Sequence, residues 1–253
     1  MTDAAPARAT EPLEPLEPFE PTGIERILCI VAHPDDMEYG ASAAVAAWTA
    51  RGIRVDYLLL TAGEAGIRGR EPGEVARLRR AEQQAACDSV GAASLTVLDL
   101  PDGLLEPGLE LRALIAHEIR RRRPQALVTM TWELRLPWGF NHADHRACGL
   151  GVIDAARDAD NPWLFTAAPD GSPALPAWKA DTLIVSGDPH PTHRVDVSGP
   201  ALEAGITSLS AHRLYLEALP EHPEPRELLT GMTREAGAAA DCEAALPVGV
   251  YAL

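Results

Sequence analysis

The sequence predicts a single α/β domain: a Rossmann-like, doubly wound, mostly parallel sheet flanked by helices. Its 253 residues, 46% hydrophobic and 23% charged, are enough for one large domain with an ordinary core. Short apolar runs, typical of strands buried on both faces, alternate with longer amphipathic segments. The connections between these segments are short, and such alternation favours a parallel sheet covered by helices.

The elements follow one another from about residue 24. Residues 27–32 read Ile-Leu-Cys-Ile-Val-Ala, a continuous apolar run that predicts the first strand. Gly52, Gly91 and Pro124 mark the ends of the first three helices, because glycine and proline commonly terminate helices. The expected strands are 27–32, 53–60, 95–98, 126–130, 181–186 and 194–197. The expected helices are 39–51, 74–90, 109–123, 143–157 and 201–219.

The N-terminal segment differs in composition from the rest of the chain. Residues 11–21 repeat a Glu-Pro-x unit, in which proline blocks helix and sheet pairing and the glutamates repel one another. We therefore predict that residues 1–22 form a disordered tail and that residues 23–253 form the domain.

Charge and apolar patterning limit the class of partner. The formal charge of −15, from 37 acidic and 22 basic residues, disfavours nucleic acid as a partner. No apolar run reaches the roughly 18 residues needed to span a membrane, and the N-terminus lacks a secretion signal. We therefore expect a cytoplasmic protein without a membrane partner. Homo-oligomerisation stays open.

A cluster of potential ligands follows the first expected strand. The strand is followed by His33-Pro34-Asp35-Asp36 and not by the glycine pattern of a dinucleotide site. Ligands of such sheets bind beyond the carboxyl ends of the strands, and a cation is a natural way to hold two adjacent carboxylates ionised. The alternative is a plain turn in which Asp35 or Asp36 caps the next helix.

A second cluster follows the fourth expected strand. Here the chain reads Asn141-His142-Ala143-Asp144-His145, again at a strand end that enters a helix, so both clusters should open onto one crevice. Two histidines and one carboxylate with an open position match a catalytic zinc site. The same donors also match a facial iron triad, so the ligand types alone do not decide the metal.

With these segments the chain resembles the LmbE-like, PIG-L-type N-acetylglucosaminyl deacetylases. The resemblance covers roughly residues 25–157 and is weaker beyond residue 160. The residues that carry it are Ala32-His33-Pro34-Asp35-Asp36, Thr61-Ala62-Gly63-Glu64-Ala65-Gly66 and Asp144-His145-Arg146.

The resemblance implies a zinc-dependent N-deacetylase that acts on an N-acylated amino sugar, or on a small molecule that contains one, through attack of zinc-bound water. It implies one Zn²⁺ per chain, held by His33, Asp36 and His145. It further implies that Asp35 is the general base, that His142 is an acid or electrostatic stabiliser, and that Asp144 orients His142.

The chain departs from the family pattern in two places. Phe140 stands near the position where some members carry a tyrosine whose hydroxyl aids the oxyanion. Met37 follows the aspartate pair where many members are acidic, and Glu38 comes next. Two other functions stay as alternatives: a metal-dependent phosphoesterase that uses the same acidic cluster, and a metal-binding module without turnover.

Further residues are candidates for the substrate site. Arg68 lies in a basic loop after the second strand, where it could bind sugar hydroxyls or a phosphate. Glu64 in the preceding turn could bind a hydroxyl or simply fix the loop. His193, in a second histidine-rich loop, could line the crevice. Arg79 and Glu82 are spaced three residues apart on an expected helix, and we interpret them as a surface ion pair.

Overall fold

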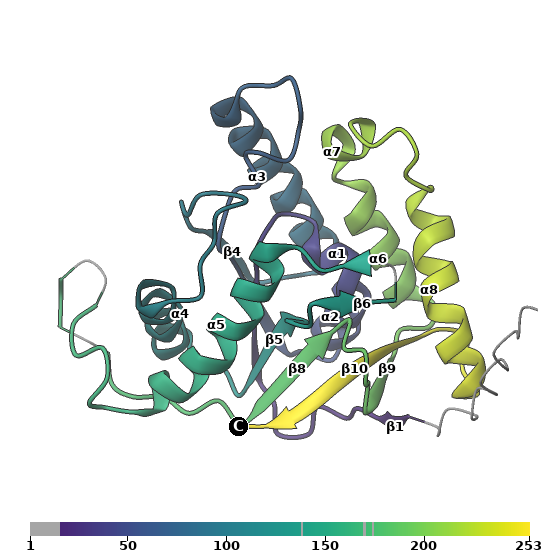
Figure 1. Cartoon of the computed structure of the whole chain (residues 1–253). Helices are drawn as coiled ribbons and strands as arrows, with labels where there is room; N and C mark the ends of the chain where they lie inside the picture. Colours follow the sequence, from purple (N-terminus) through teal and green to yellow (C-terminus); the bar gives the residue numbers. More distant parts are fainter. Residues whose placement is uncertain (1–15, 138, 169–170, 174) are drawn as a thin grey trace, which may run out of the picture.

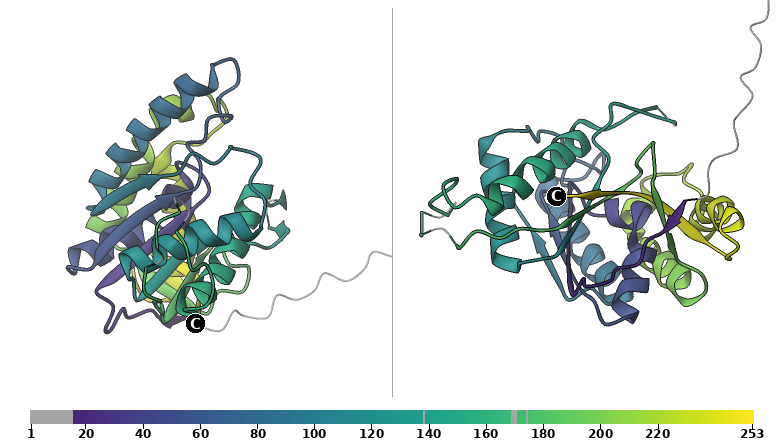
Figure 2. Two further views of the ribbon diagram at one scale, coloured as in Figure 1. Left: turned by 90° about the vertical axis from the view of Figure 1, so that its left-hand side faces the viewer. Right: turned by 90° about the horizontal axis from the view of Figure 1, so that it is seen from below.

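An eight-stranded sheet runs through the molecule, with helices on both of its faces (Figures 1 and 2). The computed structural model describes residues 16–137, 139–168, 171–173 and 175–253. The strand order is β1-β9-β10-β8-β5-β2-β3-β4, and all pairs are parallel except those of β10 with β8 and β9. The prediction of a mostly parallel α/β fold is confirmed.

The strands are β1 (Glu17–Pro18), β2 (Arg26–Val31), β3 (Arg54–Leu59), β4 (Ser94–Val97), β5 (Ala126–Met130), β6 (Arg135–Leu136), β7 (Gly139–Phe140), β8 (Thr182–Ser186), β9 (His193–Asp196) and β10 (Ala245–Ala252). The helices are α1 (Asp36–Gly40), α2 (Ser42–Ala50), α3 (Pro72–Ser89), α4 (Leu109–Arg122), α5 (Ala143–Asp160), α6 (Pro200–Ser210), α7 (Arg213–Glu217) and α8 (Pro225–Ala239). The strands β6 and β7 form a separate two-stranded hairpin.

The side chains of each central strand alternate between two apolar cores. Cys29 of β2 faces the core that contains Trp48 of α2, together with residues of α6 and α8. Leu28 and Ile30 face the opposite core, where α4 and α5 pack with Ile115 at its centre. This alternation is what a strand buried on both faces requires. Among the described residues, no helix is both long and apolar enough to cross a membrane.

Two expected helices are each divided in the structure. The helix expected at 39–51 begins earlier, at Asp36, and breaks at Ala41, whose φ of −152° is not helical. The helix expected at 201–219 breaks between α6 and α7. None of the expected elements corresponds to α8 or β10. Pro247 and Gly249 inside β10 weaken its strand pattern, because proline cannot donate to a ladder and glycine has no side chain to pack.

Part of the segment assigned to the tail packs on the domain. Residues 1–15 lie outside the described residues. Residues 17–18 form β1, which pairs with β9, and the Phe19 N–H donates to the Arg194 carbonyl at 2.8 Å. The Phe19 ring meets Trp48 edge-on, with 6.2 Å between the ring centroids. The domain described by the structure therefore includes residues that precede the expected boundary at residue 23.

Candidate metal centre and active site

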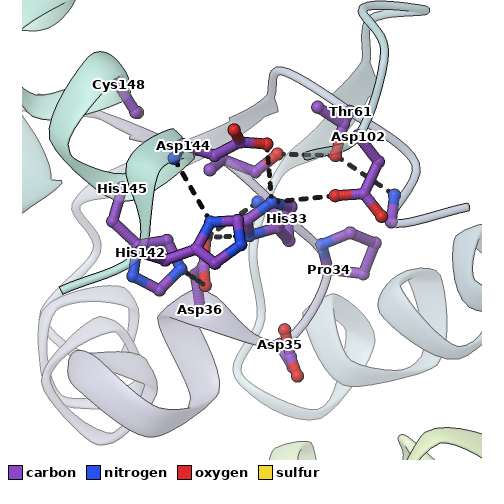
Figure 3. Close-up of polar contacts among 12 residues, drawn as sticks. His33, Pro34, Asp35, Asp36, Thr61, Asp102, His142, Asp144, His145 and Cys148 are labelled. Atoms are coloured by element: carbon purple, nitrogen blue, oxygen red, sulfur yellow. Dashed lines mark hydrogen bonds and ion pairs between the residues drawn. The ribbon is translucent and has the colours of Figure 1, made fainter. Parts of the chain in front are cut away.

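The two ligand clusters meet at the carboxyl ends of neighbouring strands. β2 leads into His33, and β5 leads through the β6–β7 hairpin to His142, the N-cap residue of α5. Figure 3 shows the rings of His33, His142 and His145 gathered about Asp36. The centroids of each pair of rings are 5.3 to 5.4 Å apart. Clusters that are more than a hundred residues apart in sequence therefore form one site.

Three side chains offer donor atoms to a single point. The potential ligand atoms of His33, Asp36 and His145 all lie within 4.8 Å of one another. The Asp36 carboxylate lies 3.2 Å from His145 Nε2 and 3.6 Å from His33 Nδ1. Two imidazoles and one carboxylate are the donor set of many catalytic zinc sites. The residues present therefore fit a divalent cation.

In both His33 and His145, the ring nitrogen that faces away from Asp36 already has a partner. His33 Nε2 lies 3.0 Å from a carboxylate oxygen of Asp102 and 3.1 Å from one of Asp144. His145 Nδ1 lies 3.1 Å from the amide oxygen of Asn141. Ligand histidines usually make such outer contacts, which fix the ring and the tautomer. His33 Nδ1 and His145 Nε2 are thus left to face Asp36 and the point between them.

The electrostatics of the cluster also favour a cation. Burial disfavours the charged imidazolium of His33, but the carboxylates of Asp36, Asp102 and Asp144 outweigh it and raise the pKa of His33 to about 12. Burial alone would raise the pKa of Asp36, yet His33 and His145 hold that pKa well below its usual range. The surrounding carboxylates therefore stabilise a positive charge at this point.

The Asp144 carboxylate contacts His33, whereas the family resemblance implied that it orients His142. Its Oδ2 accepts from the Gly103 N–H at 2.7 Å and lies 3.1 Å from His33 Nε2, and its Oδ1 accepts from the Leu105 N–H at 3.1 Å. Asp144 reaches His142 through its backbone, because its N–H donates to His142 Nδ1 at 3.2 Å. The physical reason is the helix start: His142 is the N-cap residue, and the amide two residues on needs an acceptor.

The backbone contact fixes how His142 can act. Because Nδ1 accepts a hydrogen bond, the proton of the neutral ring must reside on Nε2. Burial, together with the charges of His33 and His145, lowers the pKa of His142 and favours this neutral form. His142 therefore presents a neutral N–H donor beside the metal-ligand group.

Asp35 lies next to the three-donor group of His33, Asp36 and His145 but is not part of it. The residue has a φ of 89°, a left-handed conformation that costs a non-glycine residue about 1–3 kcal/mol. Its carboxylate is buried and lies 3.1 Å from the Arg79 guanidinium. Burial raises the pKa of Asp35, against the opposing effect of Arg79. A buried carboxyl with a raised pKa beside a candidate metal site suits proton transfer.

The interpretation of Arg79 as a surface residue is wrong. Its side chain is buried and donates to the carbonyls of Pro34 and Gly63, besides contacting Asp35. A Cβ at Gly63 would overlap the guanidinium, so the glycine of this turn leaves the space that Arg79 fills. Glu82, the expected partner, instead accepts from the Leu214 N–H at 2.6 Å.

Asp102 is a site residue that the sequence analysis missed. Its loop is tied to the turn after β3 by reciprocal bonds: Glu64 accepts from the Asp102 N–H, and Asp102 accepts from the Ala65 N–H, both at 2.8 Å. Asp102 follows β4, a third parallel strand, so the rule that found the other two clusters could also have found it. Of the two roles considered for Glu64, hydroxyl binding and loop fixing, these bonds favour the second, because Glu64 positions the Asp102 loop.

The remaining candidates lie in different places. Arg68 is exposed in the loop that follows Glu64. His193 lies on β9, edge-on to Phe19, and lines a cavity with Gln125 and Thr182 from the start of the neighbouring strands. The structure therefore does not bring His193 together with the ligand cluster. Phe140 is exposed at the end of the β6–β7 hairpin and offers no hydroxyl group.

The chain is similar in sequence and in fold to several known proteins. Residues 28–156 match the family model PIG-L, described as GlcNAc-PI de-N-acetylase. The diacetylchitobiose deacetylase of Thermococcus kodakarensis is 31% identical over 75% of this chain and 69% of its own length. A 1D-myo-inositol 2-acetamido-2-deoxy-alpha-D-glucopyranoside deacetylase of Kineococcus radiotolerans is 30% identical over 54% of this chain and 49% of its own. The solved structure of the N,N'-diacetylchitobiose deacetylase from Pyrococcus horikoshii shares the fold, with a TM-score of 0.79, 20% identity, and coverage of 91% of this chain and 85% of that one.

Proposed function

The chain belongs to the PIG-L family, and we propose that it is a zinc-dependent hydrolase that removes the acetyl group from an N-acetylated amino sugar or a conjugate of one. One observation carries the proposal: a three-donor group formed by His33, Asp36 and His145 lies beside Asp35, a buried carboxylate outside that group. A site that only stored a metal would not require that fourth carboxylate. The curated relatives that match the chain are named as deacetylases of amino-sugar compounds.

The metal site is proposed from the donor set. His33 and His145 would each supply one ring nitrogen, and Asp36 would neutralise one charge of the ion. A divalent cation bound there supplies Lewis acidity, which lowers the pKa of water and polarises a carbonyl group. Asp102, Asp144 and Asn141 hold the two rings in orientation through the outer nitrogens.

The residues of the chain then divide the proton transfers. Asp35 accepts a proton from the attacking water while the water oxygen forms a bond to the amide carbon. His142 donates its Nε2 hydrogen bond to the carbonyl oxygen as negative charge develops there. The nitrogen then takes that proton from Asp35, the C–N bond breaks, and the nitrogen leaves as an amine. The products are acetate and the free amino sugar. Arg68 is proposed to contact the sugar.

The experiment is a deacetylation assay with metal analysis. Metal-free protein and protein reloaded with zinc should be incubated with N-acetylglucosamine, diacetylchitobiose and a GlcNAc glycoside, and new amines detected by fluorescamine. We expect turnover only in the reloaded protein, with one zinc per chain in wild type and loss of both metal and turnover in His145→Ala. Equal metal content in the two proteins, or absence of new amine with every sugar, would contradict the proposal.

A further inference from the structure

A buried polar cluster lies behind the Asp35 turn. Glu38, Gln83, Ser208 and His212 come from α1, α3, α6 and the start of α7, and each is at most 1% exposed. Gln83 Nε2 donates to the Glu38 carboxylate at 3.2 and 3.3 Å, and Ser208 Oγ donates to Glu38 at 3.1 Å. His212 Nε2 lies 3.4 Å from Glu38. The mechanism above uses none of these four side chains.

Gln83 connects this cluster to Asp35. Its Oε1 accepts from the Asp35 N–H at 3.0 Å, while its Nε2 faces Glu38. Asp35 has the left-handed backbone described above, and such a conformation persists only where its surroundings hold it. The Gln83 contact is one of the bonds that hold the backbone there. Arg79 holds the carboxylate of the same residue from another side.

Glu38 determines which way the Gln83 amide points. A carboxylate accepts hydrogen bonds but cannot donate them, so the NH₂ group of Gln83 must face Glu38 and the oxygen must face Asp35. Ser208 and His212 are the other partners of Glu38 and keep its carboxylate in place. If the Gln83 amide were rotated by about 180°, its NH₂ group would face the Asp35 N–H. Two hydrogen-bond donors would then face each other with no acceptor between them.

We propose that Gln83, with its amide oriented by Glu38, is a positioning residue for the reaction. It holds the Asp35 backbone in the left-handed conformation in which the carboxylate contacts Arg79 and stays outside the three-donor group. This inference rests on the proposed function, in which Asp35 is the general base. It assigns a catalytic consequence to a polar contact that is buried inside the protein.

The test compares two variants with a control that removes a buried hydroxyl outside the cluster. Gln83→Leu removes both contacts of the amide, and Glu38→Gln removes the constraint on its orientation at nearly constant volume. Each should lower kcat by about 10- to 100-fold, the scale of a reacting group misplaced by about 1 Å. KM should stay within about threefold and zinc content at one per chain, because neither substrate contacts nor ligands change. The control Thr233→Ala removes a buried hydroxyl of α8 that donates to the Leu229 carbonyl, and it should keep kcat within about threefold of wild type, whatever its effect on the melting temperature.

A double-variant experiment separates positioning from a general structural effect. In the Asp35→Asn background the general base is absent, so Gln83→Leu should lower kcat by less than about twofold. The inference is overturned if Gln83→Leu and Glu38→Gln leave wild-type kcat unchanged, or if Gln83→Leu lowers kcat equally in both backgrounds. If Gln83→Leu does not fold, Glu38→Gln decides the question. Wild-type protein that releases no amine, or normal turnover by Asp35→Asn alone, would count against the proposed function instead.

Discussion

The substitution Asp144→Asn tests whether the Asp144 carboxylate serves the metal site or His142. In the structure both carboxylate oxygens accept backbone N–H groups, and one of them also contacts His33. An asparagine has a single acceptor oxygen, so in either orientation its NH₂ group confronts the N–H of Gly103 or Leu105. One lost acceptor costs about 1–3 kcal/mol, which in a chain of this size corresponds to a fall of roughly 2–12 °C in melting temperature.

The metal affinity should fall as well. Loss of an outer partner of a ligand histidine typically weakens metal binding by about 10- to 100-fold. The affinity should be measured by competition with a chromophoric zinc chelator, and the melting temperature of the metal-free protein by calorimetry. His142→Ala is the matched control and should keep the wild-type affinity, because its ring is outside the three-donor group. If Asp144→Asn binds zinc as tightly as wild type but loses kcat, the carboxylate acts through His142 and the reasoning from His33 is refuted.

Three further predictions concern Asp35 as the general base, His142 as the hydrogen-bond donor to the oxyanion, and the N-terminal segment. Asp35→Asn should keep its zinc and lose about 10²- to 10⁴-fold in kcat, whereas Asp36→Asn should lose zinc; equal metal loss in both would make Asp35 a ligand. His142→Ala should lower kcat by about a hundredfold with zinc retained, and a loss below about tenfold would show that His142 does not stabilise the oxyanion. Deletion of residues 2–15 should leave the melting temperature unchanged. Deletion of residues 2–20 should lower it by roughly 4–12 °C, because this deletion removes a strand pairing and an aromatic contact together worth about 2–3 kcal/mol. Equal melting temperatures of the two shortened chains would refute this prediction.

The sequence was most informative where potential ligand side chains directly follow a strand with a clear apolar pattern. The metal-ligand candidates lie within five residues of a predicted strand end or at the start of a predicted helix, so the strand–helix pattern was enough to bring them to one edge of the sheet. The α/β fold followed from the same pattern. The structure adds which atoms face one another, such as the contact of Asp144 with His33 in place of His142.

The missed contacts depend on packing between distant segments. Arg79 has the spacing of an ordinary surface pair, and only the approach of α3 to the turns after β2 and β3 buries it. Gln83 and Glu38 are 45 residues apart, and neither lies in a pattern that marks a buried polar pair. His193 follows a proline-rich loop, and only the pairing of β9 with β1 and β10 fixes its place away from the site.

The position of β10 affects the order in which the fold can assemble. Residues 245–252 lie between β8 and β9, and β1 joins the sheet only through β9. During synthesis the β1 segment leaves the ribosome before β10. It can join the sheet only after β10, about 230 residues later in the chain, has paired with β8 and β9. Contacts of such long sequence separation slow folding, because loop closure must precede them. We therefore expect the β2–β3–β4–β5 half to form first during translation, and an exposed β8 edge to need protection until β10 arrives.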